Sequence, residues 1–213
     1  MRLGLILFTI FACSHLSACQ SLYTTYGFGK VARSLIKDET KTSIVMPENA
    51  PSISQRYRPG GISSRSEHRG FDILVPTGTE VLAAANGVIK STEVTFLYGR
   101  VIVLNHGIEP SGQRLQTRYF HLSEFKSIPG QIVERGDPIG LSGASGAAGL
   151  FPHLHFEVHR VMIKENFTSV HVLDPQAHWV EGPGKVSCFE PPALKYSDNS
   201  GLTYPVPCRV STP

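Results

Sequence analysis

Short runs in which apolar and polar residues alternate occupy the middle of the chain, from about residue 57 to about residue 180. Glycine, proline and asparagine separate the runs, as is typical of strands joined by turns. The pattern predicts an antiparallel β domain with strands over Gly70 to Val75, Glu80 to Ala85, Gly87 to Thr95, Arg100 to His106, Arg114 to Leu122, Pro138 to Ser142 and Leu154 to Arg160. Asn86-Gly87 is a strong tight-turn signal, so the strands on either side of it are expected to form a hairpin.

The flanking segments lack this periodicity. Mixed polar sequence from Gln20 to Gln55 predicts a tether with one short helix around Val31 to Ile36. Beyond Pro183, frequent prolines predict an irregular arm. The predicted organisation is a leader over residues 1–18, a tether over 19–55, the β domain over 56–180 and a Pro-rich arm over 181–213.

Length and charge narrow the possible functions. A chain of 213 residues has room for one domain of ordinary size. The net charge is +3, with 20 basic and 17 acidic residues and no long basic run. Because nucleic-acid binding needs a row of cations to neutralise phosphates, nucleic acid is not an expected partner.

The first eighteen residues resemble an export signal. A single early cation, Arg2, precedes the apolar run Leu3 to Ala12, which is too short to cross a bilayer. A few residues after the run stands Leu16-Ser17-Ala18-Cys19, which resembles the lipobox of bacterial lipoproteins. That resemblance implies cleavage before Cys19 and lipid attachment to its thiol; the alternative is an ordinary cleaved leader.

The remaining cysteines fit an exported protein. Cys13 leaves with the leader and Cys19 carries the lipid, so Cys188 and Cys208 remain as a pair in an oxidising compartment. They are expected to form a disulfide within the arm. The alternative is two free thiols.

The pattern richest in chemistry is His153-Leu154-His155. Two imidazoles two residues apart on a strand point from the same face, which makes half a metal site. His68 and Asp72, separated by Gly70 as a bend, can supply the other half. One carboxylate and two imidazoles leave an open position on a tetrahedral zinc ion, where water becomes acidic enough to act as a nucleophile. By spacing alone, His153, His155 or both can be ligands.

A third histidine lies on another predicted strand. In Thr117 to Leu122, strict alternation places Tyr119 and His121 on one face and Phe120 and Leu122 on the other. This arrangement suits the wall of a groove. The glycine-rich run from Ser142 to Gly149 lacks the lysine of a phosphate-binding loop and is expected to be a flexible groove loop.

Together these stretches resemble the lysostaphin-type zinc endopeptidases of the bacterial cell wall, peptidase family M23. The similarity extends over roughly Arg56 to Pro175, in matching order and spacing. It rests on His68-Arg69-Gly70-Phe71-Asp72-Ile73, Pro76-Thr77-Gly78-Thr79-Glu80-Val81, Ala84-Ala85-Asn86-Gly87-Val88, Asn105-His106-Gly107, Tyr119-Phe120-His121-Leu122, Val133-Glu134-Arg135-Gly136-Asp137-Pro138-Ile139-Gly140 and Pro152-His153-Leu154-His155-Phe156-Glu157.

The resemblance assigns roles by position. It implies that His68, Asp72 and His155 bind one zinc ion per chain. It implies that His121 and His153 act beside the metal as acid/base and as stabilisers of the transition state. The implied fold is a mainly antiparallel β domain with a narrow groove that holds this single zinc site.

The function expected from the resemblance is hydrolysis of peptide bonds in peptidoglycan stem peptides or cross-links. The expected partners are peptidoglycan and, through the lipid on Cys19, a membrane of the cell envelope. Gln20 after that cysteine resembles an outer-membrane sorting signal of double-membraned bacteria. The alternative is a non-catalytic envelope protein of the same fold that binds or activates other wall hydrolases; the presence of all five site residues favours the enzyme. No feature predicts the oligomeric state.

The other histidines receive structural roles. His106 is expected in a turn or in packing, His159 at the substrate edge or in solvent, and His171 and His178 at the surface. Arg58 stands where family members often carry histidine, which affects one groove wall. The tether residues Glu48 and Asn49 are candidates for a plug over the zinc.

Overall fold

The computed structural model describes residues 27–31, 43–60, 67–109, 111–149, 151–165, 167–191, 196 and 201–209. The predicted leader and Cys19 lie outside these ranges, and so does the predicted helix around Val31 to Ile36, except for Val31. Within the described ranges, no helix has the length and apolar character needed to cross a membrane.

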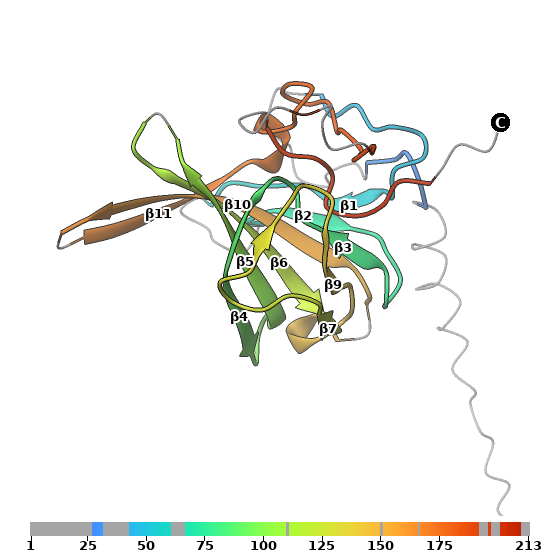
Figure 1. Ribbon diagram of the computed structural model, residues 1–213. Coiled ribbons are helices and arrows are strands. Elements are labelled where there is room, and N and C mark those ends of the chain that lie inside the picture. The colour runs from blue at the N-terminus through green and yellow to red at the C-terminus, as the bar shows by residue number, and fades with distance from the viewer. Residues whose placement is uncertain are drawn as a thin grey trace, which may run out of the picture.

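Two antiparallel sheets make up the fold (Figure 1). The larger has the order β1-β2-β10-β6-β5-β4-β8, with β11 added beside β10, and the smaller has the order β3-β9-β7. The strands are β1 (Ile53–Gln55), β2 (Phe71–Ile73), β3 (Glu80–Leu82), β4 (Gly87–Thr95), β5 (Gly99–Ile108), β6 (Arg114–Leu122), β7 (Glu124–Phe125), β8 (Ile132–Val133), β9 (Pro138–Leu141), β10 (Leu154–Lys164) and β11 (Phe167–Leu173). Two 3-10 turns are η2 (Gly146–Ala148) and η3 (Pro175–Ala177).

The predicted mainly β, antiparallel fold is confirmed. A strand lies within or over each of the seven predicted ranges. β11 is not among the predicted strands, although the β-branched residues Thr168, Val170 and Val172 stand at every second position along it. The long hairpin of β10 and β11 projects from the side of the domain (Figure 1).

The predicted hairpin at Asn86-Gly87 is wrong. β3 pairs with β9 in the smaller sheet, whereas β4 pairs with β5 and β8 in the larger one. Asn86 does not have the positive φ that such a turn requires; its side-chain oxygen accepts a hydrogen bond from the backbone N–H of Arg135 at 2.8 Å. The buried stretch Ala83 to Ala85 is therefore a crossing between sheets.

Side chains from both sheets share the main hydrophobic core. Along β10, Leu154, Phe156 and Val158 are fully buried in it. Since neighbouring residues of a strand point to opposite faces, His155, Glu157 and His159 lie on the other face of the larger sheet. That face carries a second, small apolar cluster of Val101, Val103 and Phe120.

The ends of the described chain take part in this core. Ile53 of β1 lies within the predicted tether, yet it is fully buried in the main core. Tyr204 in the Pro-rich segment is fully buried as well, and its hydroxyl donates to the carbonyl of Pro51 at 2.8 Å. The described parts of the two flanking segments thus pack against each other and against the β domain.

A disulfide joins Cys188 and Cys208 across a sequence separation of 20 residues. We expect the Cys188→Ala/Cys208→Ala variant to lose about 3 kcal/mol of unfolding free energy, because an uncrosslinked loop of this length has more freedom in the unfolded chain. Chemical denaturation of variant and wild type in non-reducing buffer measures the difference. Equal unfolding free energies would contradict a stabilising role for the disulfide.

Candidate metal centre

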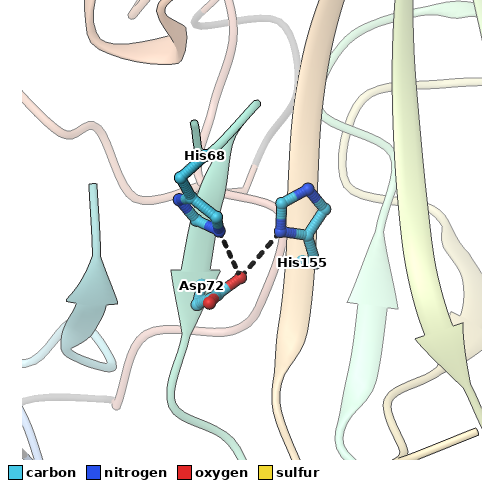
Figure 2. A group of neighbouring side chains, drawn as sticks. All are labelled: His68, Asp72 and His155. Carbon is cyan, nitrogen blue, oxygen red and sulfur yellow. Dashed lines mark hydrogen bonds and ion pairs between the residues drawn. The ribbon is translucent and has the colours of Figure 1, made fainter. Parts of the chain in front are cut away.

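Three side chains converge on one carboxylate oxygen. His68 Nε2 lies 3.1 Å and His155 Nδ1 lies 2.7 Å from the same Asp72 Oδ1 (Figure 2). One potential ligand atom from each residue lies within 4.8 Å of the others. The structure thus brings together the three residues to which the family resemblance assigns the metal.

Strand register creates this convergence. Asp72 of β2 pairs directly with His155 of β10, so residues 83 positions apart become neighbours on one face of the sheet. Close approach of β2 to β10 needs Gly70, because a Cβ there would lie 2.1 Å from the carbonyl oxygen of Phe156. The chain bends at Gly70 as predicted, without a positive φ, and the missing side chain also allows this close packing.

The segment before β2 holds His68 in place. His68 Nδ1 lies 2.8 Å from the carbonyl oxygen of Arg56. A carbonyl only accepts, so Nδ1 carries the hydrogen and the Nε2 lone pair of the neutral ring is directed to the site. The backbones of His68 and Arg58 also exchange two hydrogen bonds. Residue 58 thus supports His68 through backbone atoms. Arginine at this position provides the same backbone hydrogen bonds as the histidine that family members often carry there.

A second acidic residue, Glu157, lies behind His155. Its Oε1 is 3.1 Å from His155 Nε2, and its Oε2 is 2.5 Å from His159 Nε2. Burial alone would raise the pKa of Glu157, but hydrogen bonds from His155 and His159 lower it to about 2. The prediction that His159 faces substrate or solvent is wrong: this residue is 1% exposed. No role is predicted for Glu157 from the sequence, although its place two residues after His155 puts both side chains on one face of the strand.

His121 and His153 line the same cleft, and backbone carbonyls orient both rings. His121 Nδ1 lies 2.9 Å from the carbonyl of Ser145, and His153 Nδ1 lies 2.7 Å from that of Phe151. Each Nδ1 therefore carries the hydrogen, and each neutral ring keeps its lone pair on Nε2. The ring centroids lie 4.9 Å apart, and His153 Nε2 is 3.7 Å from Asp72 Oδ1. Burial lowers the pKa of His121 to about 4, which favours its neutral, proton-accepting form.

His121 reaches the cleft through an unusual backbone conformation. It has a φ of +62° and is the sole non-glycine residue with positive φ in the described part of the chain. The turn interrupts the strand's alternation, so Tyr119 and Leu122 point into the main core while His121 lines the cleft. The prediction that Tyr119 and His121 share a face is wrong. Tyr119 is fully buried and accepts a hydrogen bond from the backbone N–H of Ala84.

The cleft over these residues has a volume of about 330 Å³. Besides the five site residues its lining consists of Gln55, Leu97, Tyr98, Ala147 and Ala148. The predicted groove loop thus contributes η2 to one wall.

Among the described residues neither Glu48 nor Asn49 lines the cleft, and the Asn49 side chain donates to the carbonyl of Arg209 at 2.7 Å. The proposed plug by these two residues is wrong.

Charge in the metal-free site is tightly balanced. Burial alone would raise the pKa of Asp72, yet hydrogen bonds from His155 and His68 hold it well below its usual range. Burial alone would lower the pKa of His155, but its hydrogen bonds with Asp72 and Glu157 raise it to about 9. In the absence of metal, His155 is therefore charged at neutral pH and a proton occupies the Nδ1 lone pair.

This balance predicts how stability depends on pH. The pKa of His155 is raised from 6.5 to about 9 in the folded, metal-free protein, so the pairing stabilises fully below pH 6.5 and is lost as the pH rises through 9. The metal-free protein should lose on the order of 1–3 kcal/mol of unfolding free energy over this window. Urea denaturation in chelator at several pH values measures the slope. His155→Gln should flatten it and exposed His171→Asn should retain it; an unchanged slope in His155→Gln would contradict the assignment.

The donor set fits one zinc ion. Imidazole nitrogens and carboxylate oxygens are both ligands that zinc binds in proteins, and three protein ligands leave a further position for water or substrate. The three residues are largely buried, as their side-chain exposures of 12%, 8% and 13% indicate. Two more imidazoles within the same cleft provide nitrogen atoms that can accept a proton. The arrangement is suited to metal-assisted hydrolysis.

Comparison with known proteins points to the same chemistry. Peptidase family M23 matches residues 66–170. A peptidoglycan DD-endopeptidase of Vibrio cholerae, ShyA, is 40% identical over 91 residues, which is 43% of this chain and 20% of ShyA. An uncharacterized metalloprotease of Haemophilus influenzae is 34% identical over 138 residues, which is 63% of this chain and 26% of that protein. The matched region thus spans about a quarter or less of the length of these two relatives.

A solved structure resembles part of the fold. The catalytic domain of lysostaphin from Staphylococcus simulans is 28% identical and superimposes with a TM-score of 0.48. The match covers 59% of this chain and 89% of that domain.

Proposed function

We propose that this protein is a zinc metalloendopeptidase that hydrolyses peptide bonds in peptidoglycan. The match of peptidase family M23 to residues 66–170 supports this proposal. The observation that carries the proposal is the convergence of His68, Asp72 and His155 in a cleft that also contains His121 and His153. Names of relatives support the substrate class, since ShyA and ShyC are both described as peptidoglycan DD-endopeptidases. The bond would lie in a stem peptide or a cross-link.

The five site residues divide into three metal ligands and two groups that exchange protons in this mechanism. His68, Asp72 and His155 would hold one zinc ion, which supplies Lewis acidity and lowers the pKa of water toward 7. The Nε2 atoms of His121 and His153 can accept the proton of the attacking water and return it to the leaving amine. Once its Nε2 has taken up a proton, either imidazole can also donate a hydrogen bond from Nε2 to the oxyanion of the transition state.

Digestion of purified peptidoglycan, followed by mass spectrometry of the products, tests the activity and identifies the bond. We expect new peptide termini with the wild type and none with Asp72→Asn, which keeps the shape of the side chain but removes its charge. His171→Asn, on the exposed part of β11, is the matched control and should cleave normally. A protein that holds stoichiometric zinc but leaves every peptide bond intact would favour the non-catalytic alternative.

The location proposed for the enzyme is the cell envelope. Export by residues 1–18 and lipid attachment at Cys19 would anchor it facing the periplasm or wall, at the outer membrane in a double-membraned host. Two partners follow, peptidoglycan as substrate and the membrane through the lipid. Labelled palmitate should enter the wild type in cells but not Cys19→Ser; equal labelling of both would rule out this anchor.

A further inference from the structure

A buried carboxylate connects His155 to a second histidine that does not reach the cleft. Glu157 lies between His155 and His159, with one oxygen 3.1 Å from His155 Nε2 and the other 2.5 Å from His159 Nε2. Glu157 is 5% exposed and His159 1% exposed. All three side chains leave the same face of β10 because they stand two residues apart.

The chemistry of these groups sets the direction of each hydrogen bond. An ionised carboxylate only accepts, so both Nε2 atoms must donate to Glu157. His155 is then held as the tautomer with hydrogen on Nε2, which leaves the Nδ1 lone pair for the metal. Its Nδ1 is the nitrogen that faces Asp72 at 2.7 Å. The partner on the far side of the ring thus selects the nitrogen that binds.

From this geometry we infer that Glu157 and His159 are positioning residues for the zinc ligand His155, acting in series. The inference rests on the zinc site of the proposed function. Glu157 fixes the rotation and tautomer of the His155 ring, and His159 fixes the carboxylate of Glu157. Partners of this kind are typical of metal-binding histidines, whose second nitrogen usually donates to a carboxylate or carbonyl.

The surroundings of His159 favour a role through Glu157. His159 lies opposite Gln116 of β6 and Val172 of β11, within the sheet and away from the cleft lining. Its Nδ1 is buried and makes no hydrogen bond to any described residue. The one polar contact that the structure gives this imidazole is therefore to Glu157. Without it, a buried carboxylate oxygen would lose its partner and the carboxylate could rotate away from His155.

Zinc affinity, measured by competition with a chromophoric chelator, tests the inference without any assay of activity. Glu157→Leu and His159→Leu should each weaken zinc binding by about 10–100-fold, the usual cost of an outer-shell partner. His159→Gln can still donate to Glu157 and should recover most of the affinity. His171→Leu, on the exposed part of β11, should bind zinc like the wild type.

The outcomes separate positioning from mere stabilisation. Leucine variants that fold less stably but bind zinc as tightly as the wild type would overturn this inference and leave the zinc site intact. A wild type that binds no zinc would overturn the zinc site and this inference together. If the leucine variants do not fold, long-range ¹H–¹⁵N spectra of the zinc-loaded wild type show which ring nitrogens carry hydrogen. Hydrogen on Nε2 of both His155 and His159 supports the positioning of His155 through Glu157. Hydrogen on Nδ1 of His159 overturns it.

Discussion

His155→Ala should lower zinc affinity by more than roughly 10–100-fold, which is the loss expected when a residue that only hydrogen-bonds to a zinc ligand is removed. His153→Ala should retain near-normal zinc affinity. The two imidazoles are equivalent by spacing, but the structure separates them. His155 Nδ1 lies 2.7 Å from Asp72 Oδ1 and within the three-residue ligand group. His153 Nε2 is 3.7 Å from that oxygen, and its other nitrogen is bonded to the carbonyl of Phe151.

Chelator competition on both variants measures this difference directly. His155→Gln, which is less disruptive in volume, serves as a second variant if alanine impairs folding. Circular dichroism of the metal-free proteins shows whether each has folded. Equal losses of affinity in His153→Ala and His155→Ala would mean that both histidines are ligands, and the division of roles would then be wrong.

His121→Ala should lower kcat by about 10²–10⁴-fold while zinc binding stays close to that of the wild type. Its ring lies in the cleft, where Nδ1 donates a hydrogen bond to the carbonyl of Ser145. The ring centroid is 4.9 Å from that of His153. The side chain is therefore placed to exchange a proton or to contact the oxyanion, without belonging to the ligand group. Removing it eliminates one of the two groups available for that task.

Steady-state kinetics on a defined peptidoglycan fragment, together with zinc content, tests this prediction. Tyr98→Phe is a matched control, since it alters the same cleft lining without removing an imidazole. The dependence of kcat on pH adds a second readout. If His121 is a general base, kcat should fall as the pH drops below the pKa of the base, and this fall should be absent in His121→Gln. Loss of zinc from His121→Ala in proportion to its activity would contradict a purely catalytic role.

Much of the site could be predicted because it depends on residue type and order. The two-residue spacing of His153 and His155 predicts that both imidazoles point from one face of a strand, and both line the cleft. The resemblance brought His68 and Asp72 into the same ligand group as His155, and these three residues do converge. What alternation does not supply is strand register, and the pairing of Asp72 with His155 appears only in the assembled sheet.

The errors have a common physical origin in local rules that tertiary contacts override. Strict alternation put Tyr119 and His121 on one face, but a φ of +62° at His121 breaks the alternation. Asn86-Gly87 has the composition of a tight turn, yet the Asn86 side chain bonds to Arg135 and the flanking strands enter different sheets. The prediction that His159 lies at the substrate edge or in solvent is wrong because its burial depends on neighbouring strands, and the partner residues on β6 and β11 are not evident from the local pattern.

By itself, the sequence determined the class of fold and the kinds of ligand, which follow from the two-residue period of a strand and from side-chain chemistry. The acid/base roles of His121 and His153 come from the family resemblance and stay a prediction. Tertiary structure alone decided which imidazole nitrogen faces Asp72, how His121 enters the cleft and what stands behind His155. Those details depend on contacts between segments far apart in the chain, where a carbonyl or carboxylate on one strand selects the tautomer of a ring on another.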